Sequence, residues 1–516
     1  MSATLIVLVL AVLAFMSGRI PIGVVAIGVA VSLWLTGVLD LGEALAGFGD
    51  PTVIFVAALF VVSESLDATG VTAWAGSQVI QRAGTGRAVL LVVIGLLVAA
   101  VTAFISVNGA VAALIPMVVV VAMRARIPPS QMLLPLAFAA HAGSLLALTG
   151  TPVNIIVSEL AHEAGARSFG FFEFALVGLP LLAGTLVITL LFGRFLLPLR
   201  TPAKLPTDLS AHAITLRAQY DLPEGGSLTS PAQGIAEVIV APRSELIGLH
   251  LFPGMSTPSG DLVVIGLQRG GIDLTGTKPV LRAGDTLLLS GAWDDLERHT
   301  SGDDVVVVTP PAELRRGVPL GHGAKRSIAV LLAMVALLAT GVLPAVIAGL
   351  LAVMALILLG VLTPAQAYRS ISWTTVVLIA GMIPLGTAFI KTGTADMFAD
   401  GLLRLTGEAS PTIALLVICV LTMVLGQLIS NTATVLVVAP VAVAVANELG
   451  VSVLPFLMGL AVAGAAAFLT PVATPANLMV MEPGGYRFGD YWKLGLPLLL
   501  MYLIAAVFWV PVLLPF

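Results

Sequence analysis

Long stretches without a charged residue recur along this chain and limit what it can fold into. Ala88–Phe104, Ser327–Thr340 and Leu494–Val512 each run for most or all of a bilayer crossing without a charge, where a helix needs about 20 residues. Charged residues make up only 10% of the 516 residues, compared with roughly 25% in a soluble globular domain. The chain is therefore predicted to be an all-α polytopic membrane protein surrounded by membrane lipid.

Two apolar blocks, residues 1–199 and 326–516, flank a more polar segment, residues 200–325. That segment begins with a linker rich in Pro, Thr and Asp, and its core at about 217–308 has the alternating pattern of short strands. The expected elements are strands at Ala236–Ala241, at Asp261–Gln268 and after the turn Gly284-Asp285, and a helix at Trp293–His299. We predict a small α/β domain inserted between two membrane blocks.

The two apolar blocks are related by a constant offset, in which Pro344 lies 323 positions after Pro21. Matches at Gly, Pro and Asn carry more weight than matches at the abundant Ala, Val and Leu, and they fall in one ungapped register. The same offset pairs Gly18 with Gly341, Gly37 with Gly360, Gly70 with Gly393, Asn108 with Asn431, Thr151 with Thr474, Pro152 with Pro475, and Asn154 with Asn477. The sequence therefore predicts an internal repeat.

Each block is expected to contain the same series of spans. The series is two spans, a third span, two apolar segments meeting at a polar tip, a span ending at a Thr-Pro break, and a last span. The ranges are 3–17, 20–38, 51–67, 88–124, 131–152 and 172–198 in the first block, and 326–342, 344–361, 373–390, 411–447, 453–475 and 491–514 in the second. If the paired segments are re-entrant hairpins, each block crosses five times and the second repeat is inverted.

The short loops divide Lys and Arg unevenly between the two sides of this topology. One side holds Arg19, Arg87, Arg200, Lys325 and most of the others, and such a side is normally cytoplasmic. The central domain is therefore expected in the cytoplasm, and both termini are expected outside a cell membrane.

Four polar interruptions break the apolar pattern, two in each block. Non-helical backbone inside a membrane is tolerated only around a cavity, and the helix that follows each break presents free N–H groups and a positive dipole end. Such ends bind an anion without basic side chains, while carbonyl, Asn and Ser oxygens suit Na⁺. The interruptions are 106–109, 149–154, 430–432 and 472–477. The alternative is that these Ser, Thr and Asn side chains only hold helices together.

The second block resembles the divalent anion:sodium symporter family, which includes sulfate, dicarboxylate and citrate carriers. The resemblance rests on the Ser-Asn-Thr tip at 430–432, the Thr-Pro-Ala-Asn break at 474–477 and the following 483–491. It implies a homodimer whose hairpins and broken helices move as a rigid elevator against a scaffold. By that resemblance Ser430, Asn431, Thr432, Thr474 and Pro475 face the anion, and Asn431 holds a sodium with the backbone around Gly426, Ile429 and Ala473.

The first block departs from the family's usual tip, which is Ser-Asn-Thr or Asn-Asn-Thr. This chain has Val107-Asn108-Gly109, with Ser106 one place early, so a hydroxyl is lost although Asn108 and the Gly109 N–H remain. The equivalent anion site comprises Asn108, Gly109, Thr151 and Pro152, and the equivalent sodium site comprises Ser106, Asn108 and Gly150. The missing donor disfavours a bulky dicarboxylate.

The central segment is similar to the RCK-type C-terminal regulatory domain of potassium transport proteins. The similarity rests on 237–248 and 282–291. It implies a module that dimerises and in some proteins binds a nucleotide or an ion. Relatives that carry such domains are often sulfate permeases, and a purely structural role is an equal alternative.

These observations predict a secondary transporter that couples Na⁺ to uptake of a small divalent anion, sulfate before a C4-dicarboxylate. His141 and Glu64 are candidates for proton coupling, since intramembrane ionisable groups are often functional; the alternatives are a packed histidine and a solvated acid. A cation/proton exchanger and a ligand-gated channel are the other classes. No phosphate loop, zinc motif or nucleophile elbow marks an enzyme. Neither an organic cofactor nor a nucleic-acid partner is expected.

Overall fold

The computed structural model describes most of the chain. The described residues are 2–17, 19–72, 74–75, 86–200, 233–250, 255–256, 261–270, 272–274, 279–300, 302, 304–308, 323–394, 397, 410–471 and 473–516. Within them the protein is mainly helical, with one small sheet between the helical halves of the sequence. Gly18, much of the expected linker and part of the 217–308 core lie outside the described residues.

The helices of the two halves follow one another in the same order. The first half has α1 (Ser2–Ser17), α2 (Ile22–Leu35), α3 (Leu41–Leu45), η1 (Ala46–Gly49), α4 (Pro51–Ala68), α6 (Arg87–Thr102), α7 (Val107–Arg124), η2 (Pro129–Gln131), α8 (Leu133–Gly143), η3 (Leu148–Gly150), α9 (Pro152–Glu163) and α10 (Ala175–Leu196). The second has α14 (Ala324–Thr340), α15 (Ala345–Leu358), α16 (Pro364–Ser370), α17 (Trp373–Lys391), α19 (Pro411–Leu425), α20 (Asn431–Glu448), α21 (Leu454–Ala465), α22 (Pro475–Met481), η4 (Phe488–Asp490), α23 (Tyr491–Ile504), the π-helix η5 (Ala505–Trp509) and α24 (Val510–Leu513).

The offset between the two blocks reappears in local structure. A capping box starts both α3 and α16: Asp40 and Glu43 form one, and the equivalent Thr363 and Gln366 form the other. Left-handed glycines follow equivalent helices, with φ of 69° at Gly37 and 66° at Gly360, and 68° at Gly70 and 63° at Gly393. A left-handed residue ends a helix at low cost only when it is Gly. The paired glycines therefore end equivalent helices of the two halves in the same way.

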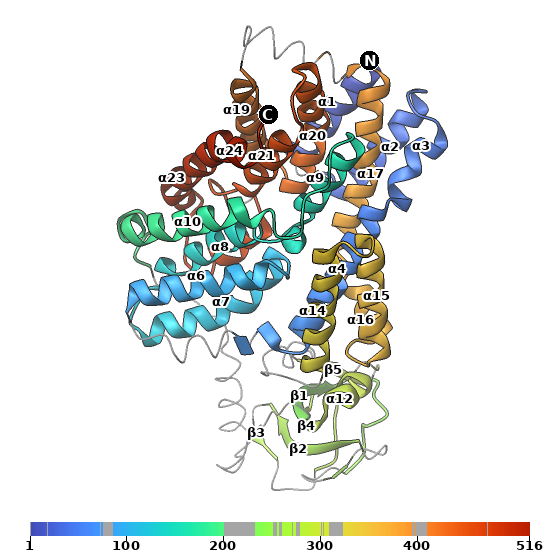
Figure 1. The fold of residues 1–516 in the computed structure, drawn as a ribbon. Helices are drawn as coiled ribbons and strands as arrows, with labels where there is room; N and C mark the ends of the chain where they lie inside the picture. Colours follow the sequence, from blue (N-terminus) through green and yellow to red (C-terminus); the bar gives the residue numbers. More distant parts are fainter. Residues whose placement is uncertain are drawn as a thin grey trace.

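The early helices of each half pack around a long helix of the other half. In the group formed by α1, α2, α3 and α17, a Cβ on Gly381 would lie 2.6 Å from the Ala26 backbone. In the group formed by α4, α14, α15 and α16, a Cβ on Gly349 would lie 2.8 Å from the Phe55 ring. The glycines therefore allow α2 to lie against α17 and α15 against α4. We call these two groups together the scaffold bundle (Figure 1).

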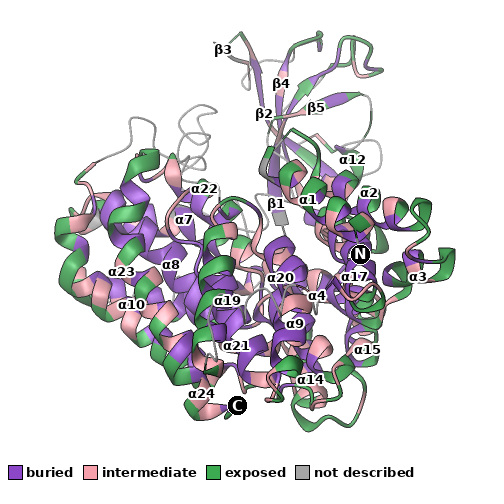
Figure 2. Ribbon diagram, turned by 90° about the horizontal axis from the view of Figure 1, so that it is seen from above, coloured by how far each residue is buried: buried purple, intermediate pink, exposed green. Residues whose placement is uncertain are grey.

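The remaining helices, α6–α10 and α19–α24, form a second group that we call the hairpin bundle (Figure 1). Both α8 and α21 are buried along their whole length. By contrast, many large side chains on the outer faces of α2, α10, α15 and α23 are exposed, and nearly all of them are apolar (Figure 2). Exposed apolar faces around a buried centre are expected of a protein solvated by lipid.

Among the described residues, five helical segments are long and apolar enough to cross a membrane. They are Leu41–Ala68, Ala175–Leu196, Trp373–Lys391, Asn431–Glu448 and Phe488–Leu513. Seven further apolar helices are shorter, and they include α6, α19 and α21 of the expected hairpins and broken helices. The protein is therefore a multi-pass membrane protein.

The third span of the first block begins at Pro51, as expected, with Asp50 as the N-cap of α4. Two other expected helix boundaries were wrong. The broken helices end at Gly143 and Ala465, well before the Thr-Pro pairs, and the chain to Thr151 and Thr474 is largely non-helical. Side chains such as Asn154 and Asn477 bond the carbonyls of these segments, and sequence periodicity does not show such contacts.

The inserted segment forms an antiparallel five-stranded sheet with the order β3-β2-β4-β1-β5. Its strands are β1 (Gln233–Val240), β2 (Leu262–Arg269), β3 (Ile272–Asp273), β4 (Thr286–Ala292) and β5 (Val305–Val307), and α12 (Trp293–His299) packs on the sheet. A buried Asp285 pairs with Arg269 at 2.7 Å. The Gln366 amide of α16 donates to Glu297 of α12 at 3.4 Å, so the module touches the scaffold bundle.

Candidate functional site

Both polar tips are helix starts capped by serine. Ser106 caps α7, and its Oγ accepts a hydrogen bond from the Gly109 N–H at 3.2 Å. Ser430 caps α20, and its Oγ accepts from the Ala433 N–H at 3.4 Å. Serine is a strong N-cap because its oxygen satisfies one of the free N–H groups of the first turn. The other N–H groups of each first turn stay available to a ligand.

Both Thr-Pro breaks are also helix starts. Thr151 precedes α9, and its Oγ1 accepts from the Val153 N–H at 3.4 Å. Thr474 precedes α22, and its Oγ1 accepts from the Asn477 N–H at 3.3 Å. Pro152 and Pro475 occupy the first helical position, where proline loses no hydrogen bond. The fold therefore contains four capped helix N-termini at the places where the sequence predicts them.

An asparagine ties each break to the helix before it. The Asn154 amide donates to the Ser144 and Ala147 carbonyls, both at 2.9 Å. The Asn477 amide donates to the Ala467 and Thr470 carbonyls at 2.7 and 3.1 Å. All three positions of the second set are the repeat equivalents of those of the first. Each asparagine thus satisfies two carbonyls of the segment between the end of the broken helix and the Thr-Pro pair.

Elements of the two halves interlock at the site. The broken helix α22 packs against α7 and α8 of the first half, and α9 packs against α20 and α21 of the second half. Gly464 of α21 lies close to α20 and α9, because a Cβ there would lie 2.9 Å from Val435 and 3.9 Å from Val153. The structure therefore brings each Thr-Pro break beside a hairpin helix of the other half.

Gln427 is a residue that the sequence analysis missed. Its amide donates to the Ala466 carbonyl at 3.0 Å, and its Oε1 accepts from the Leu469 N–H at 3.0 Å. It therefore links the second tip to the second break. The first half uses another link, in which the Thr149 hydroxyl donates to the Ala103 carbonyl at 3.0 Å. The sequence signal that could have identified Gln427 is its place in an apolar run, three positions before the tip at Ser430.

His141 lies inside the assembled site. It is 3% exposed, and its Nε2 is 3.2 Å from the Thr474 Oγ1. It therefore joins α8 of the first half to the break of the second half. Glu64, the other candidate for proton coupling, lies on α4 and is half-buried.

The first tip contains a carboxylate that the sequence did not place there. A Cβ on Gly109 would lie 3.2 Å from Asp67 Oδ2 of α4 and 3.2 Å from Ser106 Oγ. Asp67 also accepts a hydrogen bond from Thr72 at 2.7 Å. Position 109 therefore lacks the threonine hydroxyl and also lacks space for a threonine side chain, because Ser106 and Asp67 occupy that space.

The predicted site residues differ in exposure. Asn108 and Pro475 are exposed; Ser106, Gly109, Thr151, Pro152, Ser430, Asn431 and Thr432 are half-buried; His141, Gly150, Gly426, Ile429, Ala473 and Thr474 are buried. The half-buried and exposed positions cluster at the four helix starts. A solute that reached these starts would meet backbone N–H groups, hydroxyls and amides.

One group of residues suits a cation. The Asn431 Oδ1 is buried and has no hydrogen-bond partner among the described atoms. A Cβ on Gly426 would lie 3.9 Å from this oxygen, so the end of α19 and the start of α20 meet here. An unpartnered buried acceptor beside a helix end has the chemistry of an Na⁺ ligand. The described part of the chain has no cluster of three His, Cys, Asp or Glu residues for a transition metal.

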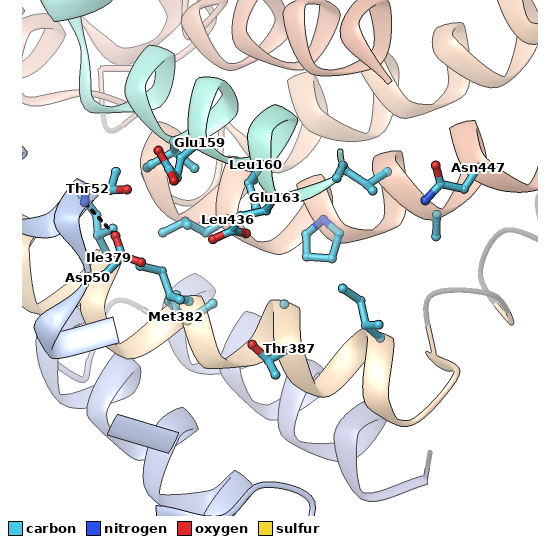
Figure 3. Close-up of a pocket in the computed structure, with 18 of the residues that line it drawn as sticks. Asp50, Thr52, Glu159, Leu160, Glu163, Ile379, Met382, Thr387, Leu436 and Asn447 are labelled. Atoms are coloured by element: carbon cyan, nitrogen blue, oxygen red, sulfur yellow. Dashed lines mark hydrogen bonds between the residues drawn. The ribbon is translucent and has the colours of Figure 1, made fainter. Parts of the chain in front are cut away.

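A cleft of about 630 Å³ separates the scaffold bundle from the hairpin bundle (Figure 3). Helices α4 and α17 line one side, and α9 and α20 line the other. Asp50, Glu159, Glu163 and Glu448 give it an acidic lining. The sequence analysis did not anticipate these acids as a group, because they come from three separate helices.

Buried broken helices, exposed apolar faces and a cleft between two bundles are features of a membrane transport protein. The chain belongs to a family of such proteins: the family model described as CitMHS, citrate transporter, matches residues 12–447 and 402–516. This membership identifies it as a transporter and not an enzyme.

The chain is 32% identical to the uncharacterized transporter YfbS of Escherichia coli (strain K12), over 99% of this chain and 98% of that protein. It is 30% identical to sodium/sulfate cotransporter 2 of Chlamydomonas reinhardtii, over 44% of this chain and 26% of the relative. Its fold is similar to the crystal structure of the Alcanivorax borkumensis YdaH transporter, with a TM-score of 0.50 and 16% identity over 92% of this chain and 86% of that one.

Proposed function

We propose that this protein is a secondary active transporter that couples Na⁺ to the uptake of a small divalent anion, with sulfate as the first candidate. The observation that carries the proposal is the pair of capped helix starts in each half, at Ser106 and Thr151 and at Ser430 and Thr474. Helix starts with free N–H groups bind anions. The relatives named sodium/sulfate cotransporters support the choice of solute and coupling ion.

The anion is assigned to the helix starts, and Na⁺ to the oxygens behind them. Asn108, Gly109, Thr151 and Pro152 form the first part of the anion site. The second part is formed by Ser430, Asn431, Thr432, Thr474 and Pro475. One sodium site comprises Gly426, Ile429, Asn431 and Ala473, and the partnerless Asn431 oxygen supports it. A second comprises Ser106, Asn108 and Gly150.

The transport mechanism is proposed to be an elevator, in which the hairpin bundle slides along the scaffold bundle. Matching hydrogen bonds at Asn154 and Asn477 support a repeat, and an odd number of crossings would invert its second copy. The links through Gln427 and Thr149 would make the hairpin bundle move as one body. The cleft between the bundles gives the moving body a surface to slide on.

Contacts between distant residues support the proposed topology. The Lys391–Glu43 pair at 2.7 Å joins the end of α17 to α3, both assigned to the outside. The Arg200–Asp490 pair at 2.7 Å joins two loops assigned to the cytoplasm. In Figure 1 both chain ends lie at the top of the view and the sheet lies at the bottom. A regulatory sheet module of the RCK type and a homodimeric assembly complete the proposal.

One observation favours another anion, and a second observation favours another class of transporter. The family description favours citrate or a C4-dicarboxylate as the anion. The acidic lining of the cleft favours a cation/proton exchanger, since four carboxylates attract cations.

Uptake by the purified protein in proteoliposomes tests these assignments. Radiolabelled sulfate should accumulate when Na⁺ is high outside and should not accumulate when K⁺ replaces it; unlabelled succinate and citrate should compete weakly. Asn431→Ala should abolish uptake with little change in stability, because the Asn431 oxygen makes no internal hydrogen bond. Ser168→Ala, in the exposed loop after α9 and outside the cleft lining, is the control. Absence of uptake of every divalent anion, with Na⁺/H⁺ exchange present instead, would overturn the proposal.

A further inference from the structure

One face of the scaffold helix α4 contacts the first tip. Ser63 and Asp67 lie one helical turn apart on this face. The Ser106 N–H donates to the Ser63 Oγ at 3.5 Å, and a Cβ on Gly109 would lie 3.2 Å from the Asp67 Oδ2. The other carboxylate oxygen, Oδ1, accepts a hydrogen bond from the Thr72 hydroxyl at 2.7 Å. A carboxylate of the scaffold bundle is therefore held at the start of α7.

This carboxylate takes a place that a bound anion would take. The N-terminus of a helix favours a negative group, because of its free N–H groups and its dipole. Asn108 and Gly109 lie in the first turn of α7 and belong to the first part of the proposed anion site. Asp67 is therefore a negative group of the protein itself at a position that also suits the solute.

The sequence repeat does not preserve this carboxylate. The residue 323 positions after Asp67 is Ile390, and the residue 323 positions after Gly109 is Thr432. The first tip therefore differs from the second in two ways, by an added acid and by a missing threonine. The two differences are sterically linked, because Asp67 lies where a side chain at position 109 would extend.

The two parts of the proposed anion site are neighbours in the fold. Helix α22, which starts after Thr474, packs against α7, which starts after Ser106. A C4-dicarboxylate has a negative group at each end, so a molecule with one end at the second-half helix starts places the other end near the first tip. Sulfate is smaller, and its compact charge can stay at the second-half starts. The first tip therefore matters more for a dicarboxylate than for sulfate.

We propose that Asp67 is a specificity-determining residue, which excludes C4-dicarboxylates by placing a carboxylate of the protein where their second carboxylate would lie. This inference rests on the proposed function, because it needs an anion at the second-half helix starts. Like charges brought together weaken binding strongly, and repulsion of the wrong solute gives specificity without any new contact to the right one. Because α4 belongs to the scaffold bundle and α7 to the hairpin bundle, the exclusion acts in the conformation in which the two helices meet.

Competition in proteoliposomes tests this inference, with radiolabelled sulfate, an inward Na⁺ gradient and unlabelled succinate as the competitor. Succinate should compete weakly in the wild type. Asp67→Asn keeps the shape, removes the charge and adds an amide donor. In this variant the half-inhibitory succinate concentration, divided by the half-saturating sulfate concentration, should fall by at least about tenfold. Radiolabelled succinate should then accumulate in Asp67→Asn vesicles.

Three further variants separate charge, space and general damage. Asp67→Glu keeps the charge and should keep the wild-type preference for sulfate. The double variant Asp67→Ala with Gly109→Thr removes the acid and restores the hydroxyl of the usual family tip, so it should accept succinate best. Asp295→Asn, the same change of residue type on α12 of the sheet module, should behave as the wild type.

The outcomes separate this inference from the proposed function. An unchanged preference in Asp67→Asn and in the double variant, with sulfate uptake intact, would overturn the role of Asp67 and leave the transporter assignment standing. A relaxed preference in Asp67→Glu, or a wild type that already prefers succinate, would overturn it as well. No uptake of any divalent anion by the wild type would remove both. Should Asp67→Asn fail to fold, the double variant decides, since its threonine fills the space that the acid leaves.

Discussion

Single residues at the helix breaks determine which groups are available to a ligand. The Asn154 and Asn477 amides satisfy carbonyls of the non-helical segments after α8 and α21. Ser106 and Ser430 each satisfy one N–H at the start of α7 and of α20. What remains free is therefore mainly N–H groups, which favours an anion at the starts of these helices. The same side chains that shape the backbone thus set the sign of charge that the site accepts.

Gly109 provides a prediction at this scale. Gly109→Thr restores the usual family residue, but its Cβ would lie 3.2 Å from both Asp67 Oδ2 and Ser106 Oγ. Overpacking of this kind costs about 1–3 kcal/mol, so the melting temperature and the rate of sulfate uptake should both fall. The measurements are thermal unfolding in detergent and proteoliposome uptake.

The control for Gly109 is Gly28→Ala on α2, where a Cβ meets no atom within 4 Å. Its stability should be unchanged or slightly higher, since alanine favours a helix over glycine. Adding Asp67→Ala to Gly109→Thr should recover part of the lost stability. A fully stable and active Gly109→Thr protein would contradict the steric explanation.

At the scale of elements, broken helices pair with hairpins across the two halves. A broken helix is stable only when other groups bond its free ends. For α21 and α22 these groups are Asn477 and Gln427. The stability of α21 and α22 therefore depends on a few polar contacts, although their composition is mostly apolar.

Asn477→Ala should remove two hydrogen bonds and leave the Ala467 and Thr470 carbonyls without them. Each buried group left unsatisfied costs about 1–3 kcal/mol, so a clear drop in thermal stability is expected. Asn154→Ala should produce a similar drop, because its two bonds are equivalent. Asn447→Ala, at an exposed position, should change stability by no more than about 0.5 kcal/mol. Equal stability of all three variants would contradict the capping role.

The sheet module should respond to acid. Burial alone would raise the pKa of Asp285, but hydrogen bonds from the Arg269 guanidinium and the Arg282 N–H lower it below the usual value. A carboxyl with a lowered pKa stabilises the fold above its unfolded pKa of about 4, and this contribution is lost as pH falls through the folded pKa. Amide hydrogen exchange in β4, corrected for the intrinsic rate, should therefore accelerate below pH 4.

In the Asp285→Asn variant, the amides of β4 should exchange fast already at neutral pH, and the corrected exchange rate should change little further in acid. Asp295→Asn, which removes a more exposed pair with Arg298, is the control and should follow the wild type. An unchanged acid response in Asp285→Asn would contradict this assignment.

At the scale of the molecule, the arrangement is an interlocked pair of halves with a sheet module at one end (Figure 1). The scaffold bundle combines α1–α3 of the first half with α17 of the second, and α14–α16 with α4. Neither half can complete this packing alone, because each supplies a long helix to the other half's group. Each group of the scaffold bundle is therefore complete only when both halves are present.

Labelling with a membrane-impermeant maleimide tests the topology. In a Cys419→Ala background, Ser168→Cys in the exposed loop after α9 should react on intact cells, and Ala365→Cys on α16 should react only after the membrane is opened. Cys419 is buried, so its removal leaves the accessible surface unchanged. Reaction of Ala365→Cys on intact cells would reverse the orientation.

The sequence by itself determined the membrane class, the common order of helices in the two halves and the four places where a helix starts after a polar interruption, because uncharged length and the residue types Ser, Thr, Pro, Asn and Gly act locally. Only the tertiary structure decided that α8 and α21 end well before the Thr-Pro pairs, that Asp67 occupies the first tip, and that His141 meets Thr474. These features join residues far apart in the sequence, and they depend on how one half packs against the other, which no local pattern encodes.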